Sequence, residues 1–496
     1  MSDKYLLTFA LSLFVGSTLF AQLNEVKLTT SDGAERHRFG SAVALYGNVA
    51  AIAAGNKDLG NGAFGAVYLF ENINGTWTET QMLEPDGSRP IVSFGSGLAL
   101  WQNRLAIGAQ ADSVLFPNDG SVYLYEQSGN QWVPSDTLTA VDGKDGDRLG
   151  TSVAMWGSEI IAGAPLDDDM GTNNTGSAYI FSFNGNGWTQ TEIFAPDPDD
   201  EDRFGETVAM SAQYAMVYSS GDDDVASASG AVYVFENTGS TWTYSQKLKA
   251  SDAQQTAQFG ISIDIDGDRA IIGADAHGGG NEGAAYVFQK TDTAGWVEVD
   301  KIVSSDLGAS DFFGHAVAVQ EDTLLISASG DSDNVTFGGA LYRFVHNGTS
   351  WDETKIVPSD VAMSDFFGTA VALDSGYYFC TAQTSDELGF DSGKGYVFKE
   401  AGTAMAIAPE LLLEDFQLFP NPARDAVQVS FQMQERHPLE IQLLNGQGQL
   451  VYVRKIRHPL GQHDMTIQTS DLPAGLYVLR IHSNQHSVAH KLLIGQ

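Results

Sequence analysis

The chain has 496 residues, of which 43% are apolar, so it is long enough to bury a large core. Its 63 acidic residues outnumber the 26 basic ones and give a formal net charge of −37 at pH 7. This charge argues against nucleic-acid binding, because phosphate contacts need a basic surface, and against adsorption to an anionic membrane. The single cysteine, Cys380, cannot form an internal disulfide, and we expect it to be a small buried residue.

Residues 1–21 are predicted to form a secretory signal peptide. Lys4 precedes the apolar run Tyr5–Phe20, and Ala21 follows it. The alternative is a single membrane anchor, but the run is shorter than the ~20 residues that a spanning helix needs. After removal of the signal peptide we therefore expect a protein that is not integral to a membrane.

A dipeptide motif recurs through residues 22–400 at intervals of 54 or 55 residues. In each copy an aromatic residue, or once a leucine, is followed by glycine. The copies are Phe39-Gly40, Phe94-Gly95, Leu149-Gly150, Phe204-Gly205, Phe259-Gly260, Phe313-Gly314 and Phe367-Gly368. A fixed period of this length is typical of solenoids, propellers and other repeat arrays.

Each repeat contains a second motif, Gly-x-x-Tyr-x-aromatic, and six repeats contain a tryptophan further on. The tyrosines are Tyr68, Tyr123, Tyr179, Tyr233, Tyr286, Tyr342 and Tyr396. The tryptophans are Trp77, Trp132, Trp188, Trp242, Trp296 and Trp351. We expect these side chains to form core between neighbouring repeats. The alternative is that they are platforms for sugar rings.

Each repeat is predicted to contain four short strands, here called A, B, C and D. In the first repeat these are Ser41–Leu45, Val49–Ala53, Ala66–Phe70 and Trp77–Leu83. Seven such repeats without any helical pattern predict an all-β fold, a seven-bladed β-propeller. The seventh repeat lacks a tryptophan strand, and Glu25–Leu28 matches the ends of the other D strands. We therefore expect the N-terminal strand to complete the seventh blade and close the ring.

The Phe-Gly dipeptide, the Gly-x-x-Tyr-x-Phe motif and the tryptophan strand together resemble the FG-GAP repeat family over about residues 24–400. That family is known from integrin α-subunit heads and bacterial surface proteins, so the resemblance implies a propeller with a role in adhesion. Integrin-type repeats often carry an Asp-x-Asp-x-Asp-Gly calcium loop between strands A and B. Here the A–B hairpins are too short, and only Asp264-Ile265-Asp266-Gly267-Asp268 is a fragment of that loop.

The predicted strand directions place the B–C and D–A loops on one face, and these loops carry most of the acidic residues. Residues 22–415 hold 57 acidic against 18 basic residues. One sector of this face, around the third and fourth repeats, is predicted to bind calcium weakly, because calcium accepts six to eight oxygen ligands from flexible loops. The predicted ligands are Asp167, Asp168, Asp169, Asp199, Asp200, Asp202, Asp222, Asp223 and Asp224. The alternative is plain surface charge that supports solubility and salt tolerance.

An aspartate also recurs seven or eight residues before each Phe-Gly dipeptide. The copies are Asp32, Asp86, Asp142, Asp197, Asp252, Asp306 and Asp360. We expect each of them to cap the D–A turn through its own backbone, as in an Asx turn, and the alternative is ligand binding.

The sequence shows no pattern typical of catalysis. His37, His277, His315 and His346 are scattered without metal-ligand spacing. No nucleophile elbow, phosphate-binding glycine loop or zinc-protease motif is found.

Residues 401–415 are predicted to be a linker to a small domain, residues 416–496, whose net charge is +2. Its predicted strands, which fit an antiparallel sandwich, are Ala426–Phe431, Leu439–Leu443, Gln449–Val453, Asp464–Ile467 and Leu476–Ile481. Pro420-Asn421-Pro422, Leu472-Pro473-Ala474-Gly475-Leu476-Tyr477 and Lys491-Leu492-Leu493-Ile494 resemble the type IX secretion sorting domain. The resemblance implies passage through the outer membrane of a Gram-negative bacterium by the type IX machinery. The alternative is an ordinary carbohydrate-binding or immunoglobulin-like module.

Two functions are compatible with this sequence. The first is a secreted or cell-surface, non-enzymatic binding protein that uses the acidic loop face to bind a surface protein or a glycan. The second is an exported polysaccharide lyase or hydrolase on the same scaffold. The resemblance and the missing catalytic pattern favour the first.

Overall fold

The computed structural model describes residues 23–60, 62–85, 92–168, 173–239, 241–400, 413–433, 439–444, 450–456, 461–470, 472–482 and 487–495. The predicted signal peptide, residues 1–21, lies outside this range. The chain divides into one compact unit, Gln22–Glu400, and another that includes Ala401–Gln496. The described residues form strands, turns and loops, and none of them belongs to a helix long and apolar enough to cross a membrane.

The described part of the Gln22–Glu400 unit forms seven four-stranded antiparallel sheets, so the predicted all-β fold with four strands per repeat is confirmed. Sheets 1 to 3 are β2 (Phe39–Tyr46), β3 (Val49–Asp58), β4 (Phe64–Ile73) and β5 (Thr76–Leu83); β6 (Phe94–Trp101), β7 (Arg104–Ala109), β8 (Ser121–Ser128) and β9 (Gln131–Leu138); and β10 (Val153–Trp156), β11 (Glu159–Ala164), β12 (Ser177–Phe183) and β13 (Trp188–Ile193). Sheets 4 and 5 are β14 (Phe204–Met210), β15 (Tyr214–Ser219), β16 (Ala231–Asn237) and β17 (Trp242–Leu248); and β18 (Ile263–Asp266), β19 (Arg269–Ala274), β20 (Ala284–Thr291) and β21 (Gly295–Ile302). Sheets 6 and 7 are β22 (Phe313–Gln320), β23 (Thr323–Ala328), β24 (Ala340–His346) and β25 (Trp351–Ile356); and β26 (Val371–Asp374), β27 (Tyr377–Ala382), β28 (Lys394–Glu400) and β1 (Leu23–Leu28).

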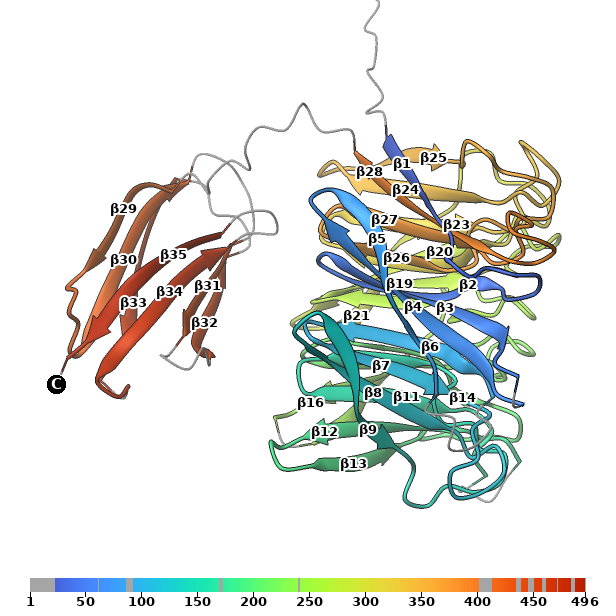
Figure 1. Ribbon diagram of the computed structural model, residues 1–496, viewed down its shortest axis with the longest axis horizontal. Coiled ribbons are helices and arrows are strands. Elements are labelled where there is room, and N and C mark those ends of the chain that lie inside the picture. Colours follow the sequence, from blue (N-terminus) through green and yellow to red (C-terminus); the bar gives the residue numbers. More distant parts are fainter. Residues whose placement is uncertain are drawn as a thin grey trace, which may run out of the picture. The chain divides into compact units, whose positions relative to one another are not determined.

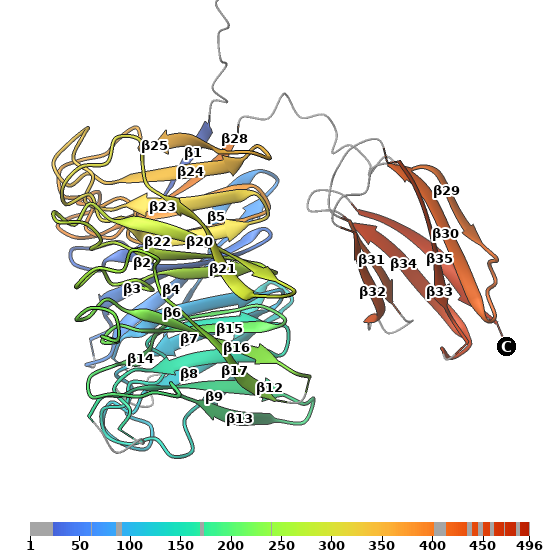
Figure 2. The same ribbon diagram turned by 180° about the vertical axis from the view of Figure 1, so that it is seen from behind.

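The A strands of the sheets contact one another in a cycle. β2 contacts β6, and the contacts continue through β10, β14, β18, β22 and β26 back to β2. Figures 1 and 2 show the sheets of this unit lying face to face, with long loops gathered on one side. Each sheet therefore packs its two faces against its two neighbours.

The N-terminal strand completes the last sheet, as predicted, because β1 pairs antiparallel with β28. It also makes the side-chain contacts of the other D strands. Glu25 accepts hydrogen bonds from the backbone N–H and the hydroxyl of Ser359, at 3.0 and 2.9 Å. In sheet 5, Glu298 accepts the same two bonds from Ser251, at 2.8 and 2.6 Å. The two ends of the unit are thus held together by side chains as well as by the strand ladder.

The two repeated motifs meet at the boundary between neighbouring sheets. Gly339, from the Gly-x-x-Tyr motif of sheet 6, forms an isolated parallel bridge with Phe367 of sheet 7. A Cβ on Gly339 would lie 2.0 Å from the carbonyl oxygen of Phe367, and the φ angle of Gly339 is +83°, so only glycine fits there. The Phe367 ring packs on Tyr396 of its own sheet, with ring centroids 5.3 Å apart. The two motifs thus recur with one period because they contact each other at boundaries between neighbouring sheets.

The repeated aromatic residues form core, as predicted. Tyr68, Tyr179, Tyr233, Tyr286, Tyr342 and Tyr396 are at most 1% exposed. Trp77 of sheet 1 packs on Phe379 of sheet 7, with ring centroids 4.8 Å apart. Cys380 is fully buried in β27, also as predicted, and burial raises the pKa of its thiol.

The second unit has two antiparallel sheets that share one core. One contains β29 (Leu413–Phe419), β30 (Ala426–Met433) and β33 (Gly461–Gln468), and the other contains β31 (Leu439–Leu444), β32 (Leu450–Ile456), β34 (Gly475–His482) and β35 (Ser487–Ile494). The predicted linker, 401–415, extends too far, because Leu413 already pairs with Met433 in the sheet. Residues 401–412 lie outside the described range. The prediction also missed β35, whose motif Lys491-Leu492-Leu493-Ile494 pairs with β34.

Candidate binding face and its carboxylate clusters

The antiparallel sheets place the B–C and D–A loops on one face, called here the loop face. On the opposite face the A–B turns are tight; Asp266, for example, pairs with Arg269 and leaves two residues in the turn. A calcium loop of the integrin type does not fit a turn of this length. The carboxylates of Asp264 and Asp266 instead accept the backbone N–H groups of Val319 and Glu321 in the next sheet, both at 2.7 Å.

The recurring aspartates of the D–A loops do not act as predicted. In six repeats the carboxylate accepts a hydrogen bond from the motif tyrosine of its own sheet, at 2.6 to 3.2 Å, while Asp86 lies outside the described residues. In sheets 3, 4, 6 and 7 the D–A turn is capped by another aspartate, two residues before the Phe-Gly motif or its Leu-Gly copy. Asp202, for example, accepts the backbone N–H of Asp199 at 2.8 Å. The Asx prediction was wrong because a buried tyrosine hydroxyl needs a partner, and this carboxylate supplies it.

In sheet 4 a lysine lies among these carboxylates. The Tyr233 hydroxyl is 2.8 Å from both Asp197 of the D–A loop and Asp222 of the B–C loop. Strand D places Lys247 directly opposite Tyr233. The Lys247 ammonium contacts Asp222, lies 3.1 Å from Asp197 and lies 2.6 Å from Asp224. Hydrogen bonds, first of all from Lys247, lower the pKa of Asp224 to about 2. In sheet 4 the ammonium group of Lys247 therefore offsets part of the negative charge of the loops.

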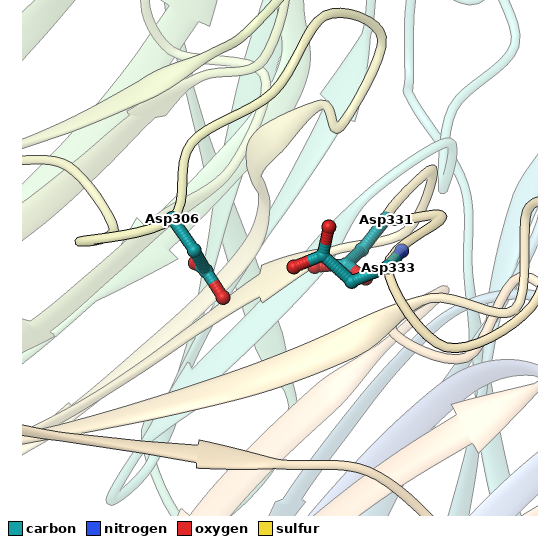
Figure 3. Close-up of side chains that lie close together, drawn as sticks. All are labelled: Asp306, Asp331 and Asp333. Atoms are coloured by element: carbon teal, nitrogen blue, oxygen red, sulfur yellow. The ribbon is translucent and has the colours of Figure 1, made fainter.

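Sheet 6 repeats this arrangement around Asp306, Asp331 and Asp333, which Figure 3 shows converging. Within the described ranges they are the one group of three potential metal ligands whose ligand atoms all lie within 4.8 Å of one another. Lys355 already lies among them, with its ammonium 2.8, 2.7 and 2.8 Å from the three carboxylates. Burial opposes the charge of Lys355, but hydrogen bonds to Asp306, Asp331 and Asp333 raise its pKa. A metal ion here would have to displace a charged lysine.

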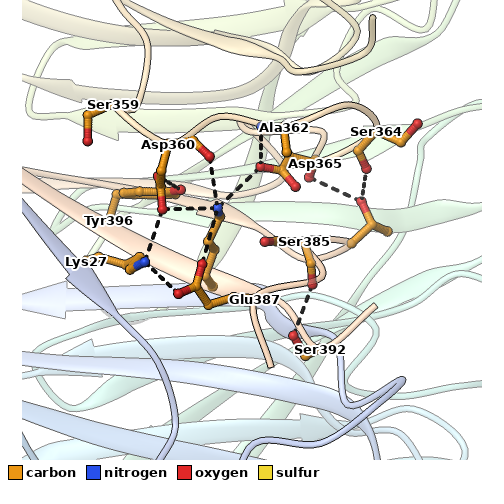
Figure 4. Close-up of polar contacts among 12 residues, drawn as sticks. Lys27, Ser359, Asp360, Ala362, Ser364, Asp365, Ser385, Glu387, Ser392 and Tyr396 are labelled. Carbon is orange, nitrogen blue, oxygen red and sulfur yellow. Dashed lines mark hydrogen bonds and ion pairs between the residues drawn. The ribbon is translucent and has the colours of Figure 1, made fainter. Parts of the chain in front are cut away.

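Two lysines of sheet 7, Lys27 and Lys394, lie near carboxylates, and Figure 4 shows Lys27 beside Asp360 and Glu387. Lys27 of β1 lies 3.1 Å from Asp360 and 2.6 Å from Glu387, and hydrogen bonds to Glu387 and Asp360 raise its pKa. The buried Lys394 lies 3.4 Å from Asp360 and 3.3 Å from Asp365. The strand that completes the sheet thus also brings one of the cations that neutralise its loops.

Sheet 3 departs from the pattern. Opposite Tyr179, strand D presents Glu192, where sheets 4 to 7 each present a lysine. The Tyr179 hydroxyl lies 3.2 Å from Asp142 and 3.1 Å from Asp167. Burial, and then the charges of Asp142 and Asp167, raise the pKa of Glu192 from its ordinary 4.5 to about 7. Sheet 3 therefore puts a third carboxylate where the later sheets put an ammonium group.

Replacing Glu192 by lysine is expected to stabilise the protein. Glu192→Lys supplies an ammonium group like those of sheets 4 to 7 and removes the repulsion of Glu192 by Asp142 and Asp167, so the free energy of unfolding should rise by about 1–2 kcal/mol near pH 7. Between pH 4.5 and about 7 the carboxyl group of Glu192 is mainly protonated in the folded protein and mainly ionised in the unfolded chain, because folding raises its pKa. The stability contributed by this group therefore falls as the pH rises through that range.

Urea unfolding of wild type and variant at about pH 5 and about pH 7.5 checks both statements. The Glu192→Lys variant should lose less stability between the two pH values than the wild type does. The control, Glu192→Gln, should show the weaker pH dependence without the full gain. A Glu192→Lys protein that is less stable than the wild type at both pH values would contradict the account of sheet 3.

The aspartates predicted to bind calcium are engaged in several separate contacts. Asp222 and Asp224 contact Lys247, and Asp167 accepts hydrogen bonds from Ser177 and Tyr179. Three others accept backbone N–H groups: Asp168 from Asn174 at 2.6 Å, Asp200 from Asn173 at 2.9 Å and Asp202 from Asp199 at 2.8 Å. Asp223 is exposed, and Asp169 lies outside the described residues. The structure therefore brings part of the predicted set together, around a lysine, and calcium binding stays a prediction.

Large apolar side chains are exposed on the loop face. Six of them, between 48% and 81% exposed, are Leu115, Phe116, Val141, Val225, Met363 and Phe390. Phe337 and Phe366, from loops of sheets 6 and 7, stack on each other with ring centroids 5.5 Å apart. Loops held by a rigid scaffold are where binding residues commonly lie.

The FG-GAP repeat family matches residues 23–70, 132–181, 188–235, 242–288, 296–344 and 351–398, which is more than half of the chain. The chain therefore belongs to the FG-GAP repeat family. Each match begins in strand D of one sheet and ends in strand C of the next, so the family repeat is offset from the sheet by one strand. The first match, 23–70, begins with β1 and agrees with its role as a D strand.

The family of secretion system C-terminal sorting domains matches residues 417–495, so the second unit is a type IX sorting domain. A sorting domain of this type indicates that the protein is exported in Bacteroidetes and is either held at the cell surface or secreted. The alternative of an ordinary carbohydrate-binding module is thereby excluded for this unit.

Among curated proteins, no sequence matched this chain. Among solved structures, the periplasmic gluconolactonase of Pseudomonas aeruginosa is similar at a TM-score of 0.42 and 10% identity, covering 85% of this chain and 98% of that one. A likeness of this degree carries no inference about activity.

Proposed function

We propose that this protein is an exported, non-enzymatic binding protein whose loop face binds a surface protein or a glycan. Its first unit is a seven-bladed β-propeller closed by β1, and residues 1–21 are the signal peptide that starts export. The observation that supports binding is the position of six exposed apolar side chains on the loops of this closed scaffold. The sorting domain supports a location where such a ligand is met.

Substitutions at the loop tips test this proposal. Phe116→Ser and Phe390→Ser remove exposed apolar contacts of the loop face, and Val299→Ser, at a position 50% exposed in β21, is the matched control away from these loops. On a glycan array and on intact host cells, we expect the two loop variants to bind at least about tenfold more weakly than the wild type. The control should bind like the wild type. Equal binding by all three variants would contradict the proposal.

The second candidate is a polysaccharide lyase or hydrolase on the same scaffold. It is favoured by one observation, that an acidic residue, Glu206, and a tyrosine, Tyr218, line one cavity of the loop face. A screen for polysaccharide degradation with the same purified protein separates the two functions. Release of new chain ends would support the enzyme, whereas retained binding without degradation would support the binding protein.

We also propose that calcium binds in the predicted acidic sector, on the side formed by the loops of sheet 3. There strand D presents Glu192, and Asp167 and Asp168 lie in the neighbouring B–C loop. A calcium ion at ~100 times its dissociation constant would add ~2.7 kcal/mol of stability. Calorimetry with calcium or with a chelator is the measurement. The calcium-dependent shift should be present in the wild type and absent from Asp167→Asn/Asp168→Asn and from Glu192→Lys. No shift in the wild type would leave the acidity as a solubility feature.

A further inference from the structure

A cavity of about 350 Å³ lies on the loop face between sheets 4 and 5. The D–A loop of sheet 4 contributes Glu201 and Arg203, strand A contributes Glu206, and strand B contributes Tyr218. Ile261 of sheet 5 is part of the opposite wall. The cavity is distinct from the tyrosine and lysine clusters described above.

Tyr218 breaks the repeat pattern at this place. The residues at its register position in the other sheets are small, namely Ala53, Gly108, Gly163, Gly273, Ser327 and Thr381. The Tyr218 ring lies against Gly260 of sheet 5, where a Cβ would come within 2.2 Å of a ring carbon. Sheet 5 thus accommodates an aromatic ring that no other sheet boundary in the described unit has at this position.

Two residues that line this cavity each carry a buried oxygen atom with no hydrogen-bond partner among the described residues. The two atoms are the Tyr218 hydroxyl, on a side chain that is 0% exposed, and Oε2 of Glu206. Burial, and then the charges of Glu206 and Asp275, raise the pKa of Tyr218, so its hydroxyl stays protonated. Buried polar atoms in folded proteins are normally paired, so two unpaired ones on side chains that line one cavity point to a ligand.

The charged residues of the cavity indicate the charge of the ligand. Arg203 pairs with Glu201 at 3.0 Å, so the carboxylate of Glu206 has no compensating cation in the cavity wall. The positions that correspond to Glu206 in the other repeats hold Ser41, Ser96, Thr151, Ile261, His315 and Thr369, none of which is acidic. An ammonium group supplies the missing positive charge and offers three hydrogen-bond donors.

The size and the polar wall of the cavity identify the rest of the ligand. A volume of about 350 Å³ exceeds what an ammonium group on a linear chain needs and has room for a sugar ring. Ser220, Thr256 and Gln258 also line it and can hydrogen-bond to hydroxyl groups. We propose that this cavity binds a glycan through an unacetylated amino sugar, with Glu206 as the counter-ion of the ammonium group and the Tyr218 hydroxyl as a second hydrogen-bond partner. This rests on the proposed function, in which the loop face binds a ligand.

Calorimetric titration of the full chain without residues 1–21 tests this inference. The probes are glucosamine, the neutral sugars glucose and N-acetylglucosamine, and the amide of Nα-acetyl-lysine. We expect glucosamine to bind at least about tenfold more tightly than the other three probes. Tyr218→Phe and Glu206→Gln should each weaken glucosamine binding at least about tenfold, while the control Tyr244→Phe, at a position 44% exposed, should bind like the wild type.

Thermal unfolding of each variant shows whether it is folded, and Glu206→Gln carries the test if Tyr218→Phe is not. Undetectable glucosamine binding by the wild type, or binding unchanged in the folded variants, would overturn the inference. Tighter binding of the lysine amide than of glucosamine would overturn the amino-sugar assignment. Phe116 and Phe390 do not line the cavity. A failure of the broader proposal would therefore appear in the loop-tip variants and not in this titration.

Discussion

A protein that lacks residues 22–30 is expected to lose much of the stability of its first unit. The deletion removes the six residue pairs between β1 and β28, the buried Leu28, and the contacts of Glu25 and Lys27. Burial of a leucine side chain contributes ~1.5–3 kcal/mol and each hydrogen bond a net ~0.5–1.5 kcal/mol, so the loss is about 5 kcal/mol or more. The total stability of a typical protein is only ~5–15 kcal/mol. The deletion also leaves β28 as an open edge near Tyr396, and such an edge invites self-association.

Thermal unfolding and gel filtration check this prediction. The comparison is between a chain that starts at residue 22 and one that starts at residue 31, both made without a signal peptide. We expect the midpoint to fall by about 10 °C or more and the shorter protein to self-associate. Lys27→Met, which keeps the strand and removes its ion pairs, should fall between the two. An unchanged midpoint in the shorter protein would mean that the unit does not depend on β1.

Removal of residues 416–496 is expected to abolish export without unfolding the first unit. The sorting domain has a core of its own, and the seven sheets of the first unit have theirs. Because recognition by the secretion machinery resides in the sorting domain, the truncated protein should remain inside the outer membrane.

Fractionation of host cells measures this effect. The fraction of protein at the surface and in the medium should fall at least about tenfold, while the purified truncated protein keeps the thermal midpoint of the first unit. Undiminished export of the truncated chain would contradict the role given to the sorting domain. A lowered midpoint would show instead that the first unit depends on the second for its stability.

The repeat signal in the sequence was strong enough to predict the sheets and their closure. The Phe-Gly and Gly-x-x-Tyr motifs recur because they meet in one backbone bridge, as between Gly339 and Phe367, and such a contact tolerates little change. The strand that completes sheet 7 was predictable because Glu25–Leu28 copies the end of the other D strands. The sequence pattern therefore predicts well the backbone contacts between neighbouring repeats and the strand that completes the last sheet.

The chemistry of the loop face was predicted less well. The role of the lysines at the ends of the D strands, such as Lys247 and Lys355, was not predicted. Their role depends on the register that places each one opposite a motif tyrosine and among loop carboxylates distant in sequence. The same register shows Glu192 as the exception, and a repeat alignment that includes strand D would have found it. The cavity beside Tyr218 depends on packing between two sheets, which no single repeat displays.

Photo-crosslinking on intact host cells tests most directly whether the loop face is the binding surface. A photoreactive amino acid at position 390, on the loop face, is compared with one at position 299 in β21, both 50% or more exposed in the wild type. We expect a crosslinked product of defined mass from position 390 and none from position 299. A product from position 299 alone would contradict it.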